Sequence, residues 1–160
     1  MLLDIVLDTN VLLHATNEQE PRRVQSQALL LALRDCTAHL CVDEGFDWNE
    51  ASNRSQIGGE YLKHLRAGTL GYAVVEHLAR SLRVKQVSRG VPQNVSRHIR
   101  RVGYGPDRTY VRVAFNSSDR VLASHDFKDL SAGVRLGLRA AIGVRVLEAG
   151  EALVALRAKA

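Results

Sequence analysis

The stretch LLDIVLDTN, residues 2–10, is a nearly continuous apolar run that ends at an acid followed by two polar residues. A short apolar run of this kind is typical of a strand buried on both faces of a parallel sheet. It predicts a core strand over residues 2–7, with Asp8 at the carboxyl end of that strand. The run has no basic region before it and no small-residue cleavage site after it, so it does not fit a signal peptide.

The rest of the chain alternates between helical and strand patterns. Apolar residues at helical spacing predict helices over residues 21–35, 57–66, 70–82, 130–141 and 151–159. Short apolar runs predict further strands at residues 38–42, 121–124 and 144–147. Strands that alternate with helices of ten or more residues indicate βαβ units. We therefore predict an α/β fold of three layers, α/β/α, with a short central parallel sheet, in a single domain over residues 1–160.

Two segments are less regular. Residues 109–115 alternate well enough for a strand, but periodicity alone does not separate a strand from a helix there. Glycine and proline punctuate residues 89–106, which we expect to be the loosest part of the chain.

Composition excludes several classes of protein. With 160 residues, 46% of them hydrophobic, the chain can fill one core, which argues against a disordered or fibrous protein. The two cysteines, Cys36 and Cys41, are too few for a disulfide framework and form no zinc-finger pattern. No apolar run approaches the roughly 18 residues of a membrane span, so we expect no membrane partner and a cytoplasmic location.

The net charge of +5 is unevenly distributed along the chain. Residues 1–77 hold 11 acidic and 6 basic side chains, whereas residues 78–112 hold 9 basic side chains and 1 acidic one. Most of those bases are arginine, whose planar fork suits phosphate groups, so a phosphate backbone is the expected partner. The alternative is a solvated helix face that offsets the acidic first half. The residues expected to contact nucleic-acid phosphates are Arg97, Arg100, Arg101 and Arg108.

Two acids are predicted to converge at one edge of the sheet. Asp8 ends the first strand, and Asp126 follows the strand at residues 121–124. Because the carboxyl ends of parallel strands face the same edge, these carboxylates would meet where ligands of such sheets bind. Ionised carboxylates that lie close together raise one another's pKa unless a cation balances them, and Mg²⁺ and Mn²⁺ prefer carboxylate and water ligands.

Glu60 and Asp107 are candidates to complete this cluster. Glu60 follows Gly58-Gly59 at an expected helix start, and Asp107 follows Gly105-Pro106 at another. Each acid also has a simpler alternative role, because Asp and Glu in the first turn of a helix commonly cap it or favour its dipole.

Taken as a set, these acids resemble the motifs of the PIN-domain family. The stretch IVLDTNVL, residues 5–12, is similar to the family's first strand, which ends in Asp-Thr-Asn. Glu60 resembles the family's second acid, and Asp107, which precedes an Ala-containing helix, resembles the third. The segment SHDF, residues 124–127, is similar to the Ser/Thr-x-Asp segment that carries the fourth. The order and spacing of these motifs extend over residues 2–155.

The resemblance implies a metal-dependent ribonuclease that hydrolyses RNA phosphodiester bonds with Mg²⁺ or Mn²⁺. The catalytic acids that would hold the cation, directly or through water, are Asp8, Glu60, Asp107 and Asp126. Asn10 and Ser124 would orient these carboxylates or the phosphate. The resemblance also favours a helix over residues 109–115.

The resemblance does not decide which residue is the second acid, because residues 43–56 hold several further acids. Asp43 directly ends a strand and is the alternative to Glu60, or a neighbour that supports the site. This uncertainty allows a second interpretation, a PIN-like module that binds RNA or a protein partner without cutting. A phosphotransfer protein also places an acid at a strand end, but the chain has neither an Asp-x-Asp motif at Asp8 nor a Gly-rich phosphate loop.

The resemblance also bears on protein partners. Many small PIN proteins are toxins that dimerise and are silenced by an antitoxin, so a homodimer and an antitoxin-like protein join RNA among the expected partners. Nothing in the chain itself indicates a toxin role.

Overall fold

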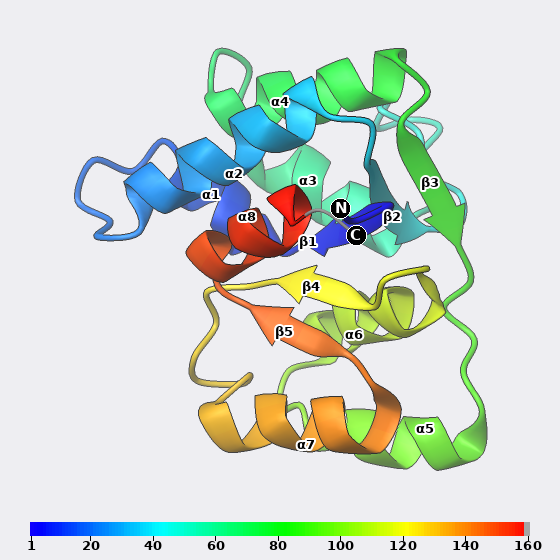
Figure 1. The fold of residues 1–160 in the computed structure, drawn as a ribbon. Helices are drawn as coiled ribbons and strands as arrows, with labels where there is room; N and C mark the ends of the chain where they lie inside the picture. The colour runs from blue at the N-terminus through cyan, green and yellow to red at the C-terminus, as the bar shows by residue number, and fades with distance from the viewer. Residues whose placement is uncertain (159–160) are drawn as a thin grey trace.

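The computed structural model describes residues 1–158, and Figure 1 shows the arrangement of its helices and strands. In chain order the elements are β1 (Asp4–Leu7), α1 (Thr9–His14), α2 (Arg23–Asp35), β2 (His39–Asp43), α3 (Gln56–His64), α4 (Leu70–Arg80), β3 (Val84–Val87), α5 (Gln93–Ile99), α6 (Gly105–Asn116), β4 (Val121–Ala123), α7 (Ala132–Ile142), β5 (Arg145–Leu147) and α8 (Ala149–Arg157). Among residues 1–158, every helix falls short of the length and apolarity that a bilayer span requires.

The five strands form one parallel sheet in the order β3-β2-β1-β4-β5. Ile5 of β1 pairs with Leu40 of β2, and on the other side of β1 Val6 pairs with Leu122 of β4. The chain first builds the sheet outward from β1 to β3, and then crosses back to add β4 on the other side of β1. The order therefore reverses between β1 and β4, and ligands of open parallel sheets bind at such a reversal, beyond the carboxyl ends of the strands.

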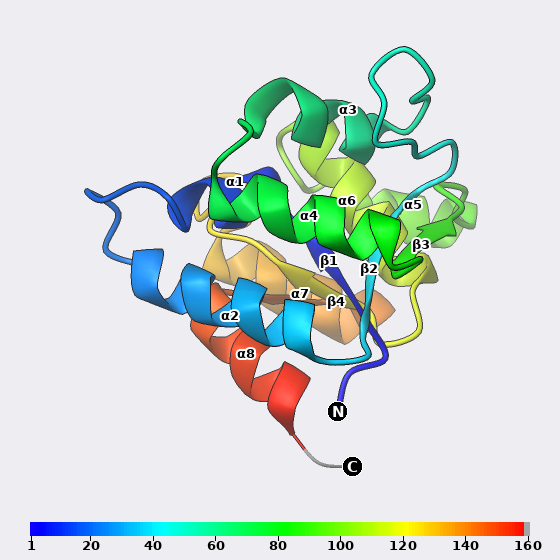
Figure 2. The ribbon, with the colours of Figure 1, turned by 90° about the horizontal axis from the view of Figure 1, so that it is seen from above.

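Helices cover both faces of the sheet, so the fold has the three predicted layers. Figure 2, the view from above, shows α2 and α8 on one side of β1 and α3 and α6 on the other. Helix α4 packs against α2, and α5 packs against α6 and α7. All residues of β1 and β4 are buried, as the apolar runs in the sequence predicted. Burial of β1 on both faces fixes the position of Asp8, the residue that follows it.

The sequence did not predict three elements: the short helix α1, which directly follows β1, strand β3 and helix α5. Strand β3 lies at the edge of the sheet and is only partly buried, so its residues show no apolar run. Helix α5 lies within the segment expected to be loose and buries only Val95 and Ile99, which are one turn apart. The residues that periodicity left undecided, 109–115, are helical and belong to α6.

Several predicted helix boundaries were wrong: the helix predicted from residue 21 begins at Arg23, and the helix predicted to residue 66 ends at His64. The helix predicted over residues 70–82 ends at Arg80, because Leu82 has a positive φ of 58° and is 87% exposed. Glu60 does not open a helix: α3 begins at Gln56, after Ser55 caps it by accepting a hydrogen bond from the N–H of Gly58. The last helix, α8, begins earlier than predicted, and Lys159, its predicted end, lies outside the described residues.

Candidate metal centre

Asp8 and Ser124 meet where the strand order reverses. Asp8 directly follows β1, and Ser124 directly follows the neighbouring β4. The Ser124 hydroxyl donates a 2.7 Å hydrogen bond to Asp8 Oδ2 and accepts one of 3.1 Å from the N–H of Asp126. One hydroxyl therefore connects the two segments that carry the predicted acids.

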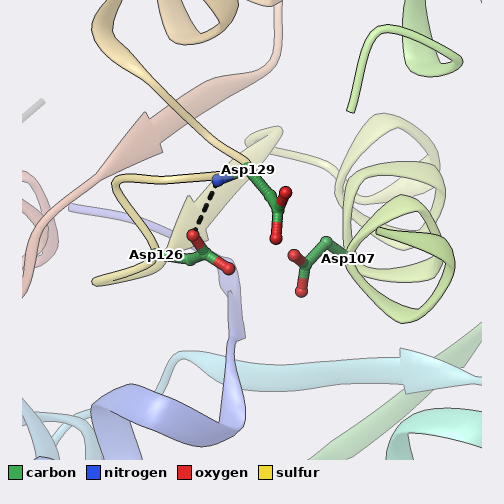
Figure 3. A group of neighbouring side chains, drawn as sticks. All are labelled: Asp107, Asp126 and Asp129. Carbon is green, nitrogen blue, oxygen red and sulfur yellow. Dashed lines mark hydrogen bonds between the residues drawn. The ribbon is translucent and has the colours of Figure 1, made fainter. Parts of the chain in front are cut away.

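Three carboxylates gather beside this pair. Asp107, Asp126 and Asp129 each offer an oxygen atom, and these three atoms all lie within 4.8 Å of one another. Asp107 comes from the first turn of α6, and the other two come from the loop between β4 and α7. The three side chains point toward one another in Figure 3. Asp126 Oδ1 accepts hydrogen bonds from the N–H groups of Lys128 and Asp129, at 3.0 and 2.9 Å.

Among residues 1–158, no basic side chain forms an ion pair with these three carboxylates. Asp107 is only 6% exposed, and its Oδ2 has no hydrogen-bond partner among residues 1–158. Burial, the nearby charge of Asp8 and the two other carboxyl groups raise the pKa of Asp107 to about 8. Burial also raises the pKa of Asp8, against the hydrogen bond from Ser124 that lowers it. A buried carboxylate without a partner is unfavourable, and a divalent cation would remove the conflict.

Asn10 and Ser124, the two predicted orienting residues, both contact Asp8. The Asn10 side-chain amide donates to Asp8 Oδ2 at 3.1 Å, and its oxygen accepts the N–H of His125 at 3.0 Å. Asn10 thus fixes the Asp8 carboxylate relative to the segment that carries Asp126.

Glu60 lies outside the group of three carboxylates. It is half-buried in α3, and its Oε2 is 3.3 Å from Nε2 of His64, one turn further along the helix. The next residue, Tyr61, donates a hydrogen bond of 2.5 Å to the Leu7 carbonyl, which holds α3 against the end of β1. Burial raises the pKa of Tyr110, and the charges of Asp8 and Glu60 raise it further. Glu60 is therefore near the site, but a neighbouring histidine already contacts its carboxylate.

Asp43, the alternative second acid, is the last residue of β2 and binds the N-terminus of α3. It is fully buried and accepts hydrogen bonds from the Ser55 hydroxyl and from the N–H groups of Gln56 and Ile57, at 2.6, 2.7 and 2.8 Å. Arg89 Nε lies 3.5 Å from its second oxygen. These contacts satisfy both carboxylate oxygens, so Asp43 stabilises the start of a helix.

Asp129 is the member of the group that sequence reasoning missed. The sequence gives only a weak indication of its role, because Asp129 is an acid three residues after Asp126, between a strand end and a predicted helix. Gly103 packs closely against it, since a Cβ atom at position 103 would lie 2.8 Å from Asp129 Oδ1. The backbone of the segment before α6 therefore approaches the carboxylate directly.

The four predicted phosphate-binding arginines divide into two kinds. Arg97, Arg100 and Arg101 are exposed, and their guanidinium groups make no hydrogen bond or ion pair within residues 1–158. Arg108 instead donates from Nε to the Val102 carbonyl at 2.7 Å and from Nη2 to the Arg100 carbonyl at 3.4 Å. Arg108 thus holds the segment before α6 in place, and only the other three are free for a phosphate.

His125 adjoins Asp126, but both of its ring nitrogens are engaged. Its Nδ1 lies 2.7 Å from Nδ1 of His14, and its Nε2 accepts the N–H of Ala149 at 3.0 Å. Burial, followed by the charges of His14 and Arg22, lowers the pKa of His125 to about 4. Since both nitrogens have partners within the protein, His125 is a packed imidazole and not a metal ligand.

The arrangement as a whole suits a hard divalent cation. Asp107, Asp126 and Asp129 supply oxygen ligands of the kind that Mg²⁺ and Mn²⁺ prefer, and Asp8 adds a fourth acid nearby. A cation in such a site can polarise a phosphoryl oxygen and lower the pKa of a bound water. No protein-family model, curated protein or solved structure matches this chain.

Proposed function

We propose that the protein is a divalent-metal-dependent ribonuclease that hydrolyses RNA phosphodiester bonds. The observation that carries this proposal is the buried Asp107 carboxylate, which has no hydrogen-bond partner among residues 1–158 and faces Asp126 and Asp129. Those three acids would hold Mg²⁺ or Mn²⁺. The bound cation would offset the phosphate charge and supply a nucleophilic water at neutral pH.

The residues around Asp8 would orient that water. Asp8 Oδ2 already accepts hydrogen bonds from Ser124 and Asn10, whereas within residues 1–158 its Oδ1 has one long contact of 3.5 Å, from the N–H of Asn10. In this proposal Oδ1 accepts a hydrogen bond from the attacking water and aims it at phosphorus. We assign Glu60 no direct contact with the cation and at most a contact through water, because its carboxylate lies outside the group of three.

Two observations support RNA as the substrate. The acids follow the order of the PIN-domain motifs, and members of that family are generally ribonucleases. Arg97, Arg100 and Arg101 are exposed just before Gly103, whose backbone touches the cluster, so they could hold phosphates that flank the cut.

Cleavage of a labelled single-stranded RNA, with and without Mn²⁺, tests the proposal. Asp126→Asn should reduce the rate at least about 100-fold, because it removes a charged ligand from the centre of the site. Asp47→Asn is the matched control, since Asp47 is an exposed loop acid. Unchanged cleavage by Asp126→Asn, or cleavage that persists in excess chelator, would contradict the metal mechanism. Equal cleavage of a DNA of the same sequence would show that RNA is the wrong substrate class.

A second candidate is a PIN-like module that binds RNA without cutting it. The observation that favours it is the contact of Glu60 with His64, which leaves one predicted acid outside the group. Mn²⁺ titration separates the two functions. A metal-dependent enzyme gains thermal stability with Mn²⁺, whereas a pure binder shows salt-sensitive RNA affinity and no response to the metal.

A further inference from the structure

Arg135, in the first half of α7, is a half-buried cation. Among residues 1–158, its guanidinium group donates hydrogen bonds to backbone carbonyls and stacks on one aromatic ring. The carbonyls that it reaches, with the donor–acceptor distances, are those of Leu130 (2.6 Å), Asp126 (3.0 Å), Ser124 (3.1 Å) and Val146 (3.5 Å). Its Cζ lies 4.6 Å from the centre of the Phe127 ring. All three guanidinium nitrogens are thus used within the protein.

Three of those carbonyls belong to the loop that carries two of the clustered acids. Ser124 and Leu130 mark the two ends of the loop, and Asp126 lies within it. One planar guanidinium therefore joins both ends of the loop and its centre to α7. Arginine suits this role because its donors lie in a fixed fork, and a lysine ammonium could not reach the same set of acceptors at once.

The loop needs such support because of its charges. Asp126 and Asp129 face Asp107 at short range, and like charges repel when no cation separates them. Among residues 1–158, the Asp126 carboxylate accepts hydrogen bonds only from the N–H groups of Lys128 and Asp129, which belong to the same loop. Those two hydrogen bonds require the turn formed by the backbone of residues 126–129. The hydrogen bonds of Arg135 to carbonyls of this loop hold that turn in place.

We propose that Arg135 is a positioning residue that fixes residues 124–130 so that Asp126 and Asp129 present their carboxylates to a cation together with Asp107. As far as cation binding is concerned, this inference rests on the proposed function. The matched control is Arg139, one turn further along α7, which is exposed and makes no side-chain hydrogen bond within residues 1–158.

Calorimetric titration with Mn²⁺, at a temperature well below unfolding, tests the effect on the cation. Arg135→Gln should weaken Mn²⁺ binding about tenfold or more, as loss of groups that orient metal ligands typically does. Arg135→Lys should give an intermediate loss, and Arg139→Gln should bind like the wild type. A residue that only stabilises the fold would lower the melting temperature and leave the Mn²⁺ affinity of the folded protein unchanged, and that result would overturn the inference. If Arg135→Gln does not fold, Arg135→Lys, which keeps the charge and the aliphatic stem, provides the comparison.

Amide hydrogen exchange at Lys128 and Asp129 tests positioning independently of the metal. Both amides should exchange faster in Arg135→Gln and in Arg135→Lys, and at the wild-type rate in Arg139→Gln. Unchanged exchange in the Arg135 variants would overturn the inference. A wild-type chain that binds no Mn²⁺ would refute the proposed function, whereas equal Mn²⁺ affinity in the wild type and in Arg135→Gln would refute only the role of Arg135.

Discussion

Ser124 and Asp8 are 116 positions apart in the sequence, and a 2.7 Å hydrogen bond joins them at the reversal of the strand order. Asp8 is only 6% exposed, so burial raises its pKa, and this hydrogen bond is the first of the contacts that lower it. The same hydroxyl accepts the N–H of Asp126. The Ser124 hydroxyl therefore lowers the pKa of Asp8 and at the same time fixes the backbone of Asp126.

Replacing Ser124 with alanine should weaken both the fold and the site. Ser124→Ala leaves a buried Asp8 oxygen with one partner fewer, which should lower the free energy of unfolding by about 1–3 kcal/mol. It should also weaken Mn²⁺ binding, because the Asp126 N–H loses its acceptor. Urea denaturation and Mn²⁺ titration measure the two effects. Ser52→Ala, at an exposed turn, is the control, and equal stability of the two variants would contradict the role given to Ser124.

Asp43 should matter for stability and not for the cation. Asp43→Asn removes the charge from a buried group that accepts three hydrogen bonds, and asparagine has only one oxygen to accept them. We expect a loss of about 2–3 kcal/mol in the free energy of unfolding. The Mn²⁺ dissociation constant of the folded variant should stay within about twofold of the wild type. A large loss of Mn²⁺ affinity without loss of stability would instead make Asp43 the second acid.

The sequence predicted most of the fold because burial and periodicity coincide in the central elements. Residues 4–7 are apolar apart from Asp4 and fully buried, so the pattern and the structure agree. Strand β3 and helix α5 escaped prediction because an edge strand and a short surface helix bury few side chains. Their patterns are set by contacts with neighbouring elements, which a single sequence does not display.

Part of the candidate site was predictable because topology determines its position. Asp8 and Asp126 follow neighbouring parallel strands, so their convergence follows from the strand order. Asp129 joins them through a loop conformation that depends on Arg135 and Gly103, and no periodicity encodes such contacts. Glu60 was expected in a first turn, but helix α3 begins earlier.

Gly103 should be required for the position of the Asp129 carboxylate. A Cβ atom at this residue would lie 2.8 Å from Asp129 Oδ1, so Gly103→Ala must push that oxygen aside. A carboxylate is a flexible end group, so the variant should fold, with Mn²⁺ affinity reduced about three- to tenfold. Gly133→Ala is the control, because a Cβ at that position meets nothing within 4 Å. Wild-type Mn²⁺ affinity in Gly103→Ala would exclude Asp129 as a ligand.

Because of Asp4, the free energy of unfolding should decrease as the pH falls below about 4. Burial alone would raise the pKa of this carboxyl group, but hydrogen bonds from Lys85 (2.9 Å) and from the N–H groups of Ser118 and Asp119 outweigh it and lower the pKa to about 2. Because the folded-state pKa lies below the unfolded value near 4, the stabilisation is complete above that value and is lost as the pH falls toward 2.

The free energy of unfolding of wild type and Asp4→Asn, measured by denaturant between pH 2 and pH 6, isolates this contribution. The free energy of unfolding of the wild type should exceed that of Asp4→Asn by about 2 kcal/mol more at pH 6 than at pH 2. Asp4 lies at the amino end of β1, the opposite edge of the sheet from the acid cluster, so the variant should keep its Mn²⁺ affinity. A difference in stability that does not change with pH would refute the ion pair with Lys85.

Arg100 and Arg101 should contribute to RNA affinity through phosphate contacts alone. They are exposed, lack partners within residues 1–158, and precede Gly103, whose backbone touches the acid cluster. The double variant Arg100→Gln/Arg101→Gln should bind a single-stranded RNA about tenfold more weakly at 0.1 M salt, and reduce the slope of log Kd against log salt by about 1.4. Its folded-state Mn²⁺ affinity should be unchanged. Arg66→Gln/Arg157→Gln removes the same charge from exposed positions elsewhere, so an equal loss of RNA affinity in that variant would mean that net charge, and not a binding surface beside the site, attracts the RNA.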